Sequence, residues 1–195
     1  MISSSGVKIL GLHLSPRKEG SSALLLTKFA EGAQDAGAKL DILSIADLDV
    51  KGCQACGGCS KNGVCIIDFD DMNQIYEAWE TYERIVIASS VFFYDLPSQG
   101  KAVLDRSQAF WSRRYVLGMH KDGKPNTKGF LLTVGATKGK DLFVPITLAV
   151  KYMFDAIAFP KSFPVLAFRK IENPESFSQE QLLEAKKAGY EFAKS

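Results

Sequence analysis

The chain has 195 residues, of which 46% are hydrophobic and 24% charged, and its formal net charge is +2 at pH 7. These values fit one globular domain over residues 1–195 and exclude a disordered chain, and the scattered lysines and arginines predict no nucleic-acid partner. The apolar runs are too short to cross a bilayer and the start lacks a secretory signal, so we expect a cytoplasmic protein with no membrane partner.

Five short apolar runs, rich in branched residues, predict β-strands. They are residues 7–14, 39–45, 84–93, 129–135 and 162–168. The run at 84–93 is the most apolar, which is typical of a strand that is buried on both faces.

The segments that follow these strands carry apolar residues at helical spacing. They are residues 23–38, 68–83, 97–111, 141–159 and 178–195. Gly37 is placed to end the first helix, and Asp70 or Asp71 to cap the second. Ser178 and Gln181 have capping-box spacing at the start of the last. Five alternations of strand and helix predict an α/β fold with a doubly wound, five-stranded parallel sheet of the flavodoxin-like order 2-1-3-4-5.

Ligands of such sheets bind where the strands end, so the loops there are the candidate sites. The loop "SPRKEGSS", residues 15–22, leads into a helix whose first amides and dipole favour an anion. Ser15, Ser21 and Ser22 would add hydroxyl donors, and Arg17 a positive charge. The usual NAD and ATP fingerprints are absent, so the loop predicts either a phosphate site of another kind or an ordinary serine-capped turn.

The loop "SSVFFYDLPSQGK", residues 89–101, places three aromatic residues in a row at the end of the third strand. Phe92, Phe93 and Tyr94 suit a flat ring system, which they would stack on or border. One of the two phenylalanines is also expected to complete the core beneath the loop.

The loop "VGATKGKD", residues 134–141, is rich in small residues. Its glycines are too close together for a phosphate loop and no Ser or Thr follows Lys140, so it predicts an amide-rich wall beside a heterocycle or a flexible turn. The three loops are expected at one edge of the sheet. A phosphate site beside a planar-ring site there predicts bound FMN.

All four cysteines lie in the stretch "CQACGGCSKNGVC", residues 53–65. Their C-x2-C-x2-C-x5-C spacing is closer to the way bacterial ferredoxins wrap a [4Fe–4S] cube than to the two separated hooks of a structural zinc site. The predicted ligands are Cys53, Cys56, Cys59 and Cys65. The unusual dihedrals that wrapping requires are expected at Gly52, Gly57, Gly58 and Gly63.

A reducing compartment disfavours disulfides here. Two alternatives to an iron–sulfur cluster remain open: a zinc site, and reduced cysteines that hold no metal.

Three stretches together resemble a known family. "GLHLSPRKEGSSALLL" resembles the opening of NAD(P)H-dependent FMN reductase-like proteins of the flavodoxin-like superfamily. "SSVFFYDLPSQGKAVLDR" resembles the second flavin loop of that family and the helix after it. With the cysteine stretch between them, the chain is similar to the iron–sulfur flavoprotein branch. The resemblance extends from Val7 to about Pro160, with a cysteine-rich loop at 50–68, and is weak over 113–128.

The resemblance implies an FMN site built from all three loops. The phosphate would be held by Ser15, Arg17, Ser21 and Ser22. The flavin would be bordered by Ser89, Val91, Phe92, Phe93 and Tyr94, and on its other edge by Gly135 and Ala136. The family usually has Asn where this chain has Ser21, so individual hydrogen bonds are expected to differ.

FMN and a cluster on one chain predict an oxidoreductase that converts between electron pairs and single electrons. The expected partner is a ferredoxin-like protein or a small-molecule electron carrier, with NAD(P)H as a candidate donor. Because the cofactors carry the chemistry, no catalytic side chain is predicted. The resemblance also implies a homodimer or homotetramer, for which Trp111 and Tyr115 are candidate interface residues.

Two other functions remain open. One is an NAD(P)H-dependent FMN or quinone reductase that holds no cluster. The other is a non-catalytic FMN-binding or metal-binding module.

Overall fold

The computed structural model describes residues 6–195 and is built on a five-stranded parallel sheet in the order β2-β1-β3-β4-β5. The strands are β1 (Lys8–His13), β2 (Lys39–Ser44), β3 (Arg84–Ser90), β4 (Lys128–Gly135) and β5 (Val165–Arg169). In the central strand, Ile87 is aligned with Leu12 of β1 on one side and with Leu131 of β4 on the other. The predicted fold class and strand order are confirmed.

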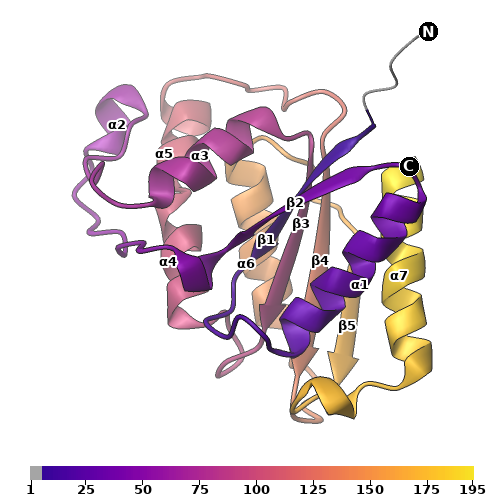
Figure 1. Ribbon diagram of the computed structural model, residues 1–195. Helices are drawn as coiled ribbons and strands as arrows, with labels where there is room; N and C mark the ends of the chain where they lie inside the picture. Colours follow the sequence, from indigo (N-terminus) through magenta and orange to yellow (C-terminus); the bar gives the residue numbers. More distant parts are fainter. Residues whose placement is uncertain (1–5) are drawn as a thin grey trace, which may run out of the picture.

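Helices cover both faces of the sheet (Figure 1). One face carries α1 (Ser21–Asp35) and α7 (Gln179–Lys194), whose core includes Phe29 and Phe192. The other carries α3 (Met72–Thr81), α4 (Ser98–Arg106), α5 (Gln108–Trp111) and α6 (Val144–Ala156), packed around Trp79 and Phe154. Because both faces are covered, β3 and β4 are buried along almost their whole length, as their apolar sequences predict.

Three local predictions need correction. The third strand ends at Ser90, because residues 92–95 fold into a tight turn instead. The helix expected over 97–111 breaks at Ser107, whose hydroxyl donates a 2.6 Å hydrogen bond to the Leu104 carbonyl and so competes with the helical ladder. A π-helical turn, η2 (Ser112–Val116), follows α5. The third concerns the cap of α3: Asp71 directly precedes the helix but its side chain makes no capping hydrogen bond, whereas Asp70, the other predicted candidate, accepts a 3.2 Å hydrogen bond from the Met72 amide.

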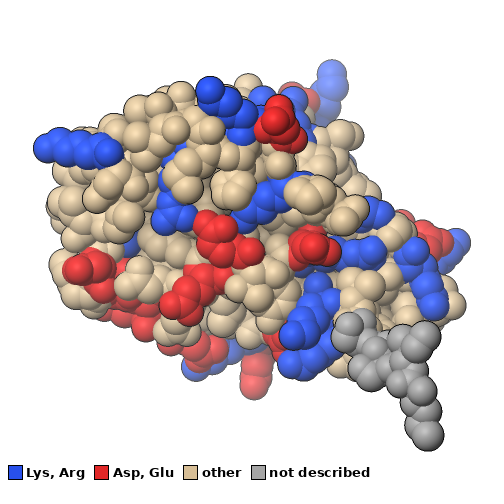
Figure 2. All heavy atoms as spheres, turned by 90° about the horizontal axis from the view of Figure 1, so that it is seen from above, with Lys and Arg blue, Asp and Glu red and all other residues tan. Residues whose placement is uncertain are grey.

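The cysteine loop (residues 50–68) follows β2 and a short 3₁₀ turn, η1 (Ile45–Asp47), and runs outside α3, α4 and α5 (Figure 1). It contains the short helix α2 (Cys59–Asn62), and a second 3₁₀ turn, η3 (Pro174–Ser176), precedes α7. Positive and negative side chains both occur across the face in Figure 2, in keeping with the near-balanced charge. Within residues 6–195 the structure has no helix with the length and apolar character that a bilayer span requires.

Candidate functional site

The loop after β1 has the features of an anion site. Ser15, Ser21 and Ser22 are buried at the sheet edge, whereas Arg17 is exposed. No side chain caps the start of α1, so the first amides of that helix have no intrahelical or capping partner. The Ser15 hydroxyl accepts a 3.4 Å hydrogen bond from the Arg17 amide, which closes the loop into a turn. The structure therefore buries three of the four residues predicted to contact a phosphate and leaves Arg17 at the surface.

A chain of four polar side chains, which the sequence did not reveal, supports this loop. His13, at the end of β1, is only 2% exposed. Its Nδ1 lies 3.2 Å from the Ser44 hydroxyl of β2, and its Nε2 lies 3.0 Å from the Ser22 hydroxyl of α1. The Ser90 hydroxyl of β3 donates a 3.3 Å hydrogen bond to Ser22. Burial lowers the pKa of His13 below its ordinary value of 6.5, so the ring is neutral at pH 7.

The loop after β3 presents its aromatics on a strained turn. The Phe92 and Asp95 backbones exchange two hydrogen bonds of 2.8 and 2.9 Å, and between them Phe93 (φ +48°) and Tyr94 (φ +66°) are left-handed. Such backbone costs about 1–3 kcal/mol for each non-glycine residue and is concentrated at functional sites. Phe92 is 42% exposed and Phe93 fully exposed. The expectation that one of them completes the core is therefore wrong.

Hydrogen bonds from the first residues of the same loop attach it to the interior of the protein. Ser89 is fully buried, and its single hydroxyl proton has two acceptors within reach, the carbonyls of Leu14 (3.3 Å) and Ser90 (3.1 Å). The Val91 amide donates to the Val134 carbonyl at 2.9 Å. Strand pairing thus ends just before the turn of residues 92–95, which we name the aromatic turn, and this fixes where the turn begins.

The three loops meet at the carboxyl edge of the sheet. Ser90 contacts Ser22 of the first loop, as described above. A Cβ on Gly100, in α4, would lie 2.7 Å from the Leu14 carbonyl oxygen, so this helix approaches the first loop closely. A Cβ on Gly139 would lie 2.5 Å from the Tyr94 hydroxyl, which places the aromatic turn against the third loop.

In that third loop, Gly135 is buried at the end of β4 and Ala136 is exposed. The Arg169 guanidinium donates to the carbonyls of Gly139 (3.2 Å) and Lys140 (2.9 Å) and tethers the loop to β5. The predicted wall of small residues therefore lies at the expected edge of the sheet, and Arg169 of β5 holds the loop in position.

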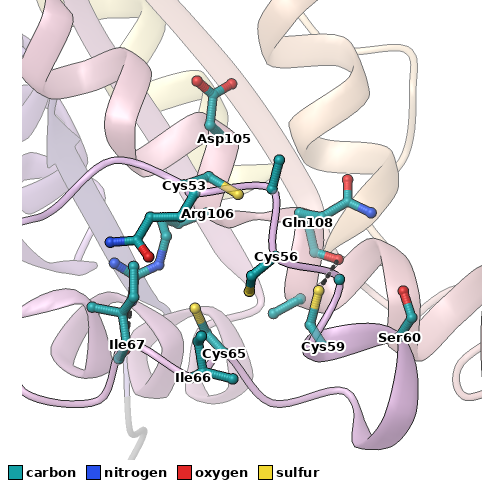
Figure 3. Close-up of a pocket in the computed structure, with 14 residues that line it drawn as sticks. Cys53, Cys56, Cys59, Ser60, Cys65, Ile66, Ile67, Asp105, Arg106 and Gln108 are labelled. Atoms are coloured by element: carbon teal, nitrogen blue, oxygen red, sulfur yellow. Dashed lines mark hydrogen bonds between the residues drawn. The ribbon is translucent and has the colours of Figure 1, made fainter.

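The four cysteines line one cavity of about 490 Å³ between the cysteine loop and the end of α4 (Figure 3). All four thiols are free, and their sulfurs gather around the same space. The Cys59 thiol donates a 3.9 Å hydrogen bond to the Gln108 carbonyl and accepts one of 3.5 Å from the Ser112 hydroxyl. The described residues hold no group of three or more His, Cys, Asp or Glu side chains placed to bind a metal ion together.

This donor set fits an iron–sulfur cluster. In a [4Fe–4S] cluster each iron takes one cysteine thiolate, so the sulfurs line a space rather than converge on a single point. The wrapping uses left-handed backbone at Ala55 (φ +52°), Gly57 (φ +72°) and Gly63 (φ +75°). Gly52 and Gly58 do not have positive φ, so that part of the glycine prediction is wrong. At Gly58 the reason is space, because a Cβ there would lie 2.5 Å from the Ile66 side chain.

A buried ion pair lies behind the cavity. Arg106, in the last turn of α4, pairs with Asp70 at 2.8 Å, and both side chains are fully buried. Burial raises the pKa of Asp70, but hydrogen bonds from Arg106 and from the Lys51 amide outweigh it and hold that pKa below its ordinary value of 3.8. Burial of the Tyr76 hydroxyl, which lies beside Arg106, raises the pKa of Tyr76 to about 12. The sequence placed Arg106 in a helix but did not indicate this contact.

The loops that carry the two candidate sites lie at opposite ends of α4 (Figure 1). The aromatic turn at 92–95 comes just before Ser98, where the helix begins, and the cysteine cavity is lined by Asp105 and Arg106, where it ends. At about 1.5 Å per residue the helix separates them by about 12 Å along its axis.

Comparison with known proteins gives the class. The profile of a family described as "NADPH-dependent FMN reductase" matches residues 7–140. The chain belongs to this family of FMN-dependent oxidoreductases, which confirms the resemblance seen in the sequence.

Individual curated relatives give a more specific comparison than the family profile. An iron–sulfur flavoprotein of Methanosarcina thermophila is 33% identical over 68% of this chain and 65% of its own length. Another, of Methanocaldococcus jannaschii, is 30% identical over 52% of each chain. The chain thus spans about half to two thirds of the length of these relatives.

Solved structures agree on the fold. An FMN-dependent NADH-azoreductase from Bacillus anthracis, solved with FMN, superposes with a TM-score of 0.69 at 13% identity, covering 95% of this chain and 99% of that one. An NAD(P)H:quinone oxidoreductase from Methanothermobacter marburgensis gives 0.64 at 14% identity, covering 95% and 96%. At these identities the likeness concerns the fold alone.

Proposed function

We propose that this chain passes electrons between a two-electron donor and a one-electron carrier through FMN and a [4Fe–4S] cluster. The observation that carries the proposal is the coexistence, on one chain of an FMN reductase family, of a three-loop edge and a cavity lined by all four cysteines. FMN exchanges electrons in pairs or singly and a cluster exchanges them one at a time, so together they interconvert the two kinds of transfer.

The first loop supplies the phosphate contacts in this proposal. The amides at the start of α1, which no side chain caps, would donate to the phosphate, together with the hydroxyls of Ser15, Ser21 and Ser22. Arg17 adds positive charge from the surface. The flavin ring would be bordered by the aromatic turn on one edge and by Gly135 and Ala136 on the other, with Ser89 and Val91 completing the border.

The cysteine loop supplies one thiolate to each iron, from Cys53, Cys56, Cys59 and Cys65. The pocket wall includes Ile67 and Ala109, buried apolar side chains that would keep water from the inner side of the cluster. The exchange partner is a ferredoxin-like protein or a small-molecule carrier, and NAD(P)H is the candidate two-electron donor.

We further propose that the chain acts as a homodimer or homotetramer in which the cluster of one subunit serves the flavin of another. Support comes from the separation of the two sites along α4, since an intermolecular route would bypass that helix. Trp111 of α5 and Tyr152 of α6 line a hollow of about 300 Å³, and exposed side chains nearby in the chain are Val144 and Leu148, also of α6, and Tyr115 of η2. Light scattering should give a mass of two or four chains, and a monomer would contradict this proposal.

An oxygen-free preparation tests the main proposal. It should contain about one FMN and about four iron and four acid-labile sulfide per chain. A Cys59→Ser variant should lose most of its iron while it keeps FMN, and Ser60→Ala, next to it, should keep both. Wild-type protein with flavin but neither iron nor sulfide, or a Cys59→Ser variant with full iron, would contradict the cluster.

A reductase without a cluster is the second candidate, and the family match favours it because that match names NADPH and FMN alone. It predicts that NADPH reduces the bound flavin equally fast in wild type and in Cys59→Ser. It also predicts that delivery to a one-electron acceptor continues in that variant, whereas the electron-transfer proposal predicts that this delivery stops. Flavin that no donor reduces would favour the third reading, a non-catalytic FMN-binding or metal-binding module.

A further inference from the structure

The two ends of the cysteine loop are held together by one side chain that is not a ligand. Arg106 Nη1 donates a 3.0 Å hydrogen bond to the carbonyl of Lys51, two residues before Cys53. Its Nη2 donates a 2.8 Å hydrogen bond to the carbonyl of Ile67, two residues after Cys65. One guanidinium thus closes the segment that contains all four cysteines.

Asp70 completes the closure. Its carboxylate accepts from Arg106 Nη1 at 2.8 Å and Nη2 at 3.3 Å, from the Lys51 amide at 2.9 Å and from the Met72 amide at 3.2 Å. Arg106 Nε donates to the Tyr76 hydroxyl at 3.3 Å, so all five N–H groups of the guanidinium have acceptors. We call Arg106 and Asp70 the loop clamp.

The clamp acts by geometry. The positive charge of Arg106 is paired with the negative charge of Asp70 at 2.8 Å, and both side chains are fully buried. The net charge that the pair presents to the cavity is therefore close to zero. A planar fork can reach two carbonyls and a carboxylate at once, whereas the point charge of a lysine cannot. The cavity wall includes Arg106 itself, so the clamp lies directly beside the thiols.

We propose that Arg106 is the positioning residue of the cysteine loop: it holds residues 51 and 67 together before any metal binds, so that the four thiols already face one cavity. This rests on the proposed function for its purpose, since the thiols are taken to hold a cluster. The clamp itself is a property of the metal-free chain. Because the clamp forms when the chain folds, most of the entropic cost of bringing four ligands together is incurred in folding and little remains for cluster binding.

Hydrogen exchange of the metal-free protein tests the clamp without any cofactor. In wild type the amides of Lys51 and Met72, which bond to Asp70, and of Asp71, which bonds to the Asp49 carbonyl, should be protected. In Arg106→Lys they should exchange about tenfold faster or more, because charged hydrogen bonds are lost. Amides of β3 and β4 should keep their protection, which separates local opening from general destabilisation.

Arg114→Lys is the matched control. Arg114 is also largely buried and paired with a carboxylate, Asp155, but its hydrogen bonds go to the Asp155 and Lys121 carbonyls, outside the cysteine loop. It should leave exchange of the loop-end amides unchanged. Unprotected loop ends in metal-free wild type, or equal exchange in Arg106→Lys, would overturn the proposal. Unprotected loop ends in wild type would overturn the proposal even if the variant does not fold.

Loaded protein gives a second readout. After anaerobic reconstitution, Arg106→Lys should release iron to a chelator about tenfold faster than wild type and Arg114→Lys, with all four cysteines present. Equal release rates would overturn the role in the cluster. If wild type takes up no cluster at all, the proposed function fails, and the exchange experiment still tests the clamp.

Discussion

His13 Nε2 lies 3.0 Å from Ser22 Oγ, and this contact gives the hydroxyl of Ser22 a direction. When Nδ1 accepts from Ser44, the neutral ring carries its proton on Nε2 and donates to Ser22. Ser22 also accepts from Ser90. With two donors directed at its oxygen, its own proton would be left for a third partner, which in the proposed FMN site is the phosphate.

Replacing His13 should therefore weaken FMN binding without touching the ligand. We expect His13→Leu to raise the dissociation constant about tenfold, since one oriented hydrogen bond is worth about 1–1.5 kcal/mol. Titration of the apoprotein, followed by flavin fluorescence, measures this. His120, the only other histidine, is exposed, so His120→Asn should bind FMN as wild type does. Equal affinity in His13→Leu would show that Ser22 needs no such orientation.

The buried histidine should also make stability depend on pH. Its pKa is lowered in the folded chain, so below about 6.5 the unfolded chain takes up a proton that the folded chain does not. Stability attributable to His13 is therefore full above pH 6.5 and falls as the pH drops toward its folded pKa, by at most about 1.4 kcal/mol per pH unit.

Urea unfolding at pH 7.5 and 5.5 measures this effect. The lowered pKa values of Asp41 and Asp70 act only below their ordinary value of 3.8, so they do not contribute in this range. Wild type should lose more stability than His13→Leu between the two pH values. An identical loss in both proteins would remove His13 as the source.

Phe93, in the aromatic turn, should lower the stability of the fold and strengthen the binding of FMN. Phe93 has φ +48° and is fully exposed, so glycine relieves strain there and removes no packing. We expect Phe93→Gly to increase the free energy of unfolding by about 1 kcal/mol and to weaken FMN binding through the lost ring. Phe93→Ala, which loses the ring but keeps the strain, should weaken binding without the gain. Unchanged affinity in both variants would place Phe93 away from the flavin.

The sequence predicted those features that depend on periodicity and spacing. Alternating apolar runs were enough to place five strands and their order, and the capping box at Ser178 and Gln181 is present. The contacts that bind one loop to another were not predictable, because nothing local marks them. His13 reads as one more buried strand residue until β2 and α1 are placed on either side of it. Arg106 reads as a helix residue until the cysteine loop folds over it.

The contact between Tyr94 and Gly139 gives a prediction that joins two of the loops. A Cβ on Gly139 would lie 2.5 Å from the Tyr94 hydroxyl and 3.3 Å from its ring carbon Cζ. Gly139→Ala should therefore push the aromatic turn outward and weaken FMN binding, by about three- to tenfold if the displacement costs roughly 1 kcal/mol. Tyr94→Phe removes the clashing oxygen and should restore most of the affinity when it is combined with Gly139→Ala. The four proteins of this double-mutant cycle, compared by fluorescence titration, should show a coupling free energy of at least about 0.5 kcal/mol. Strictly additive effects would mean that the two loops do not act on the flavin together.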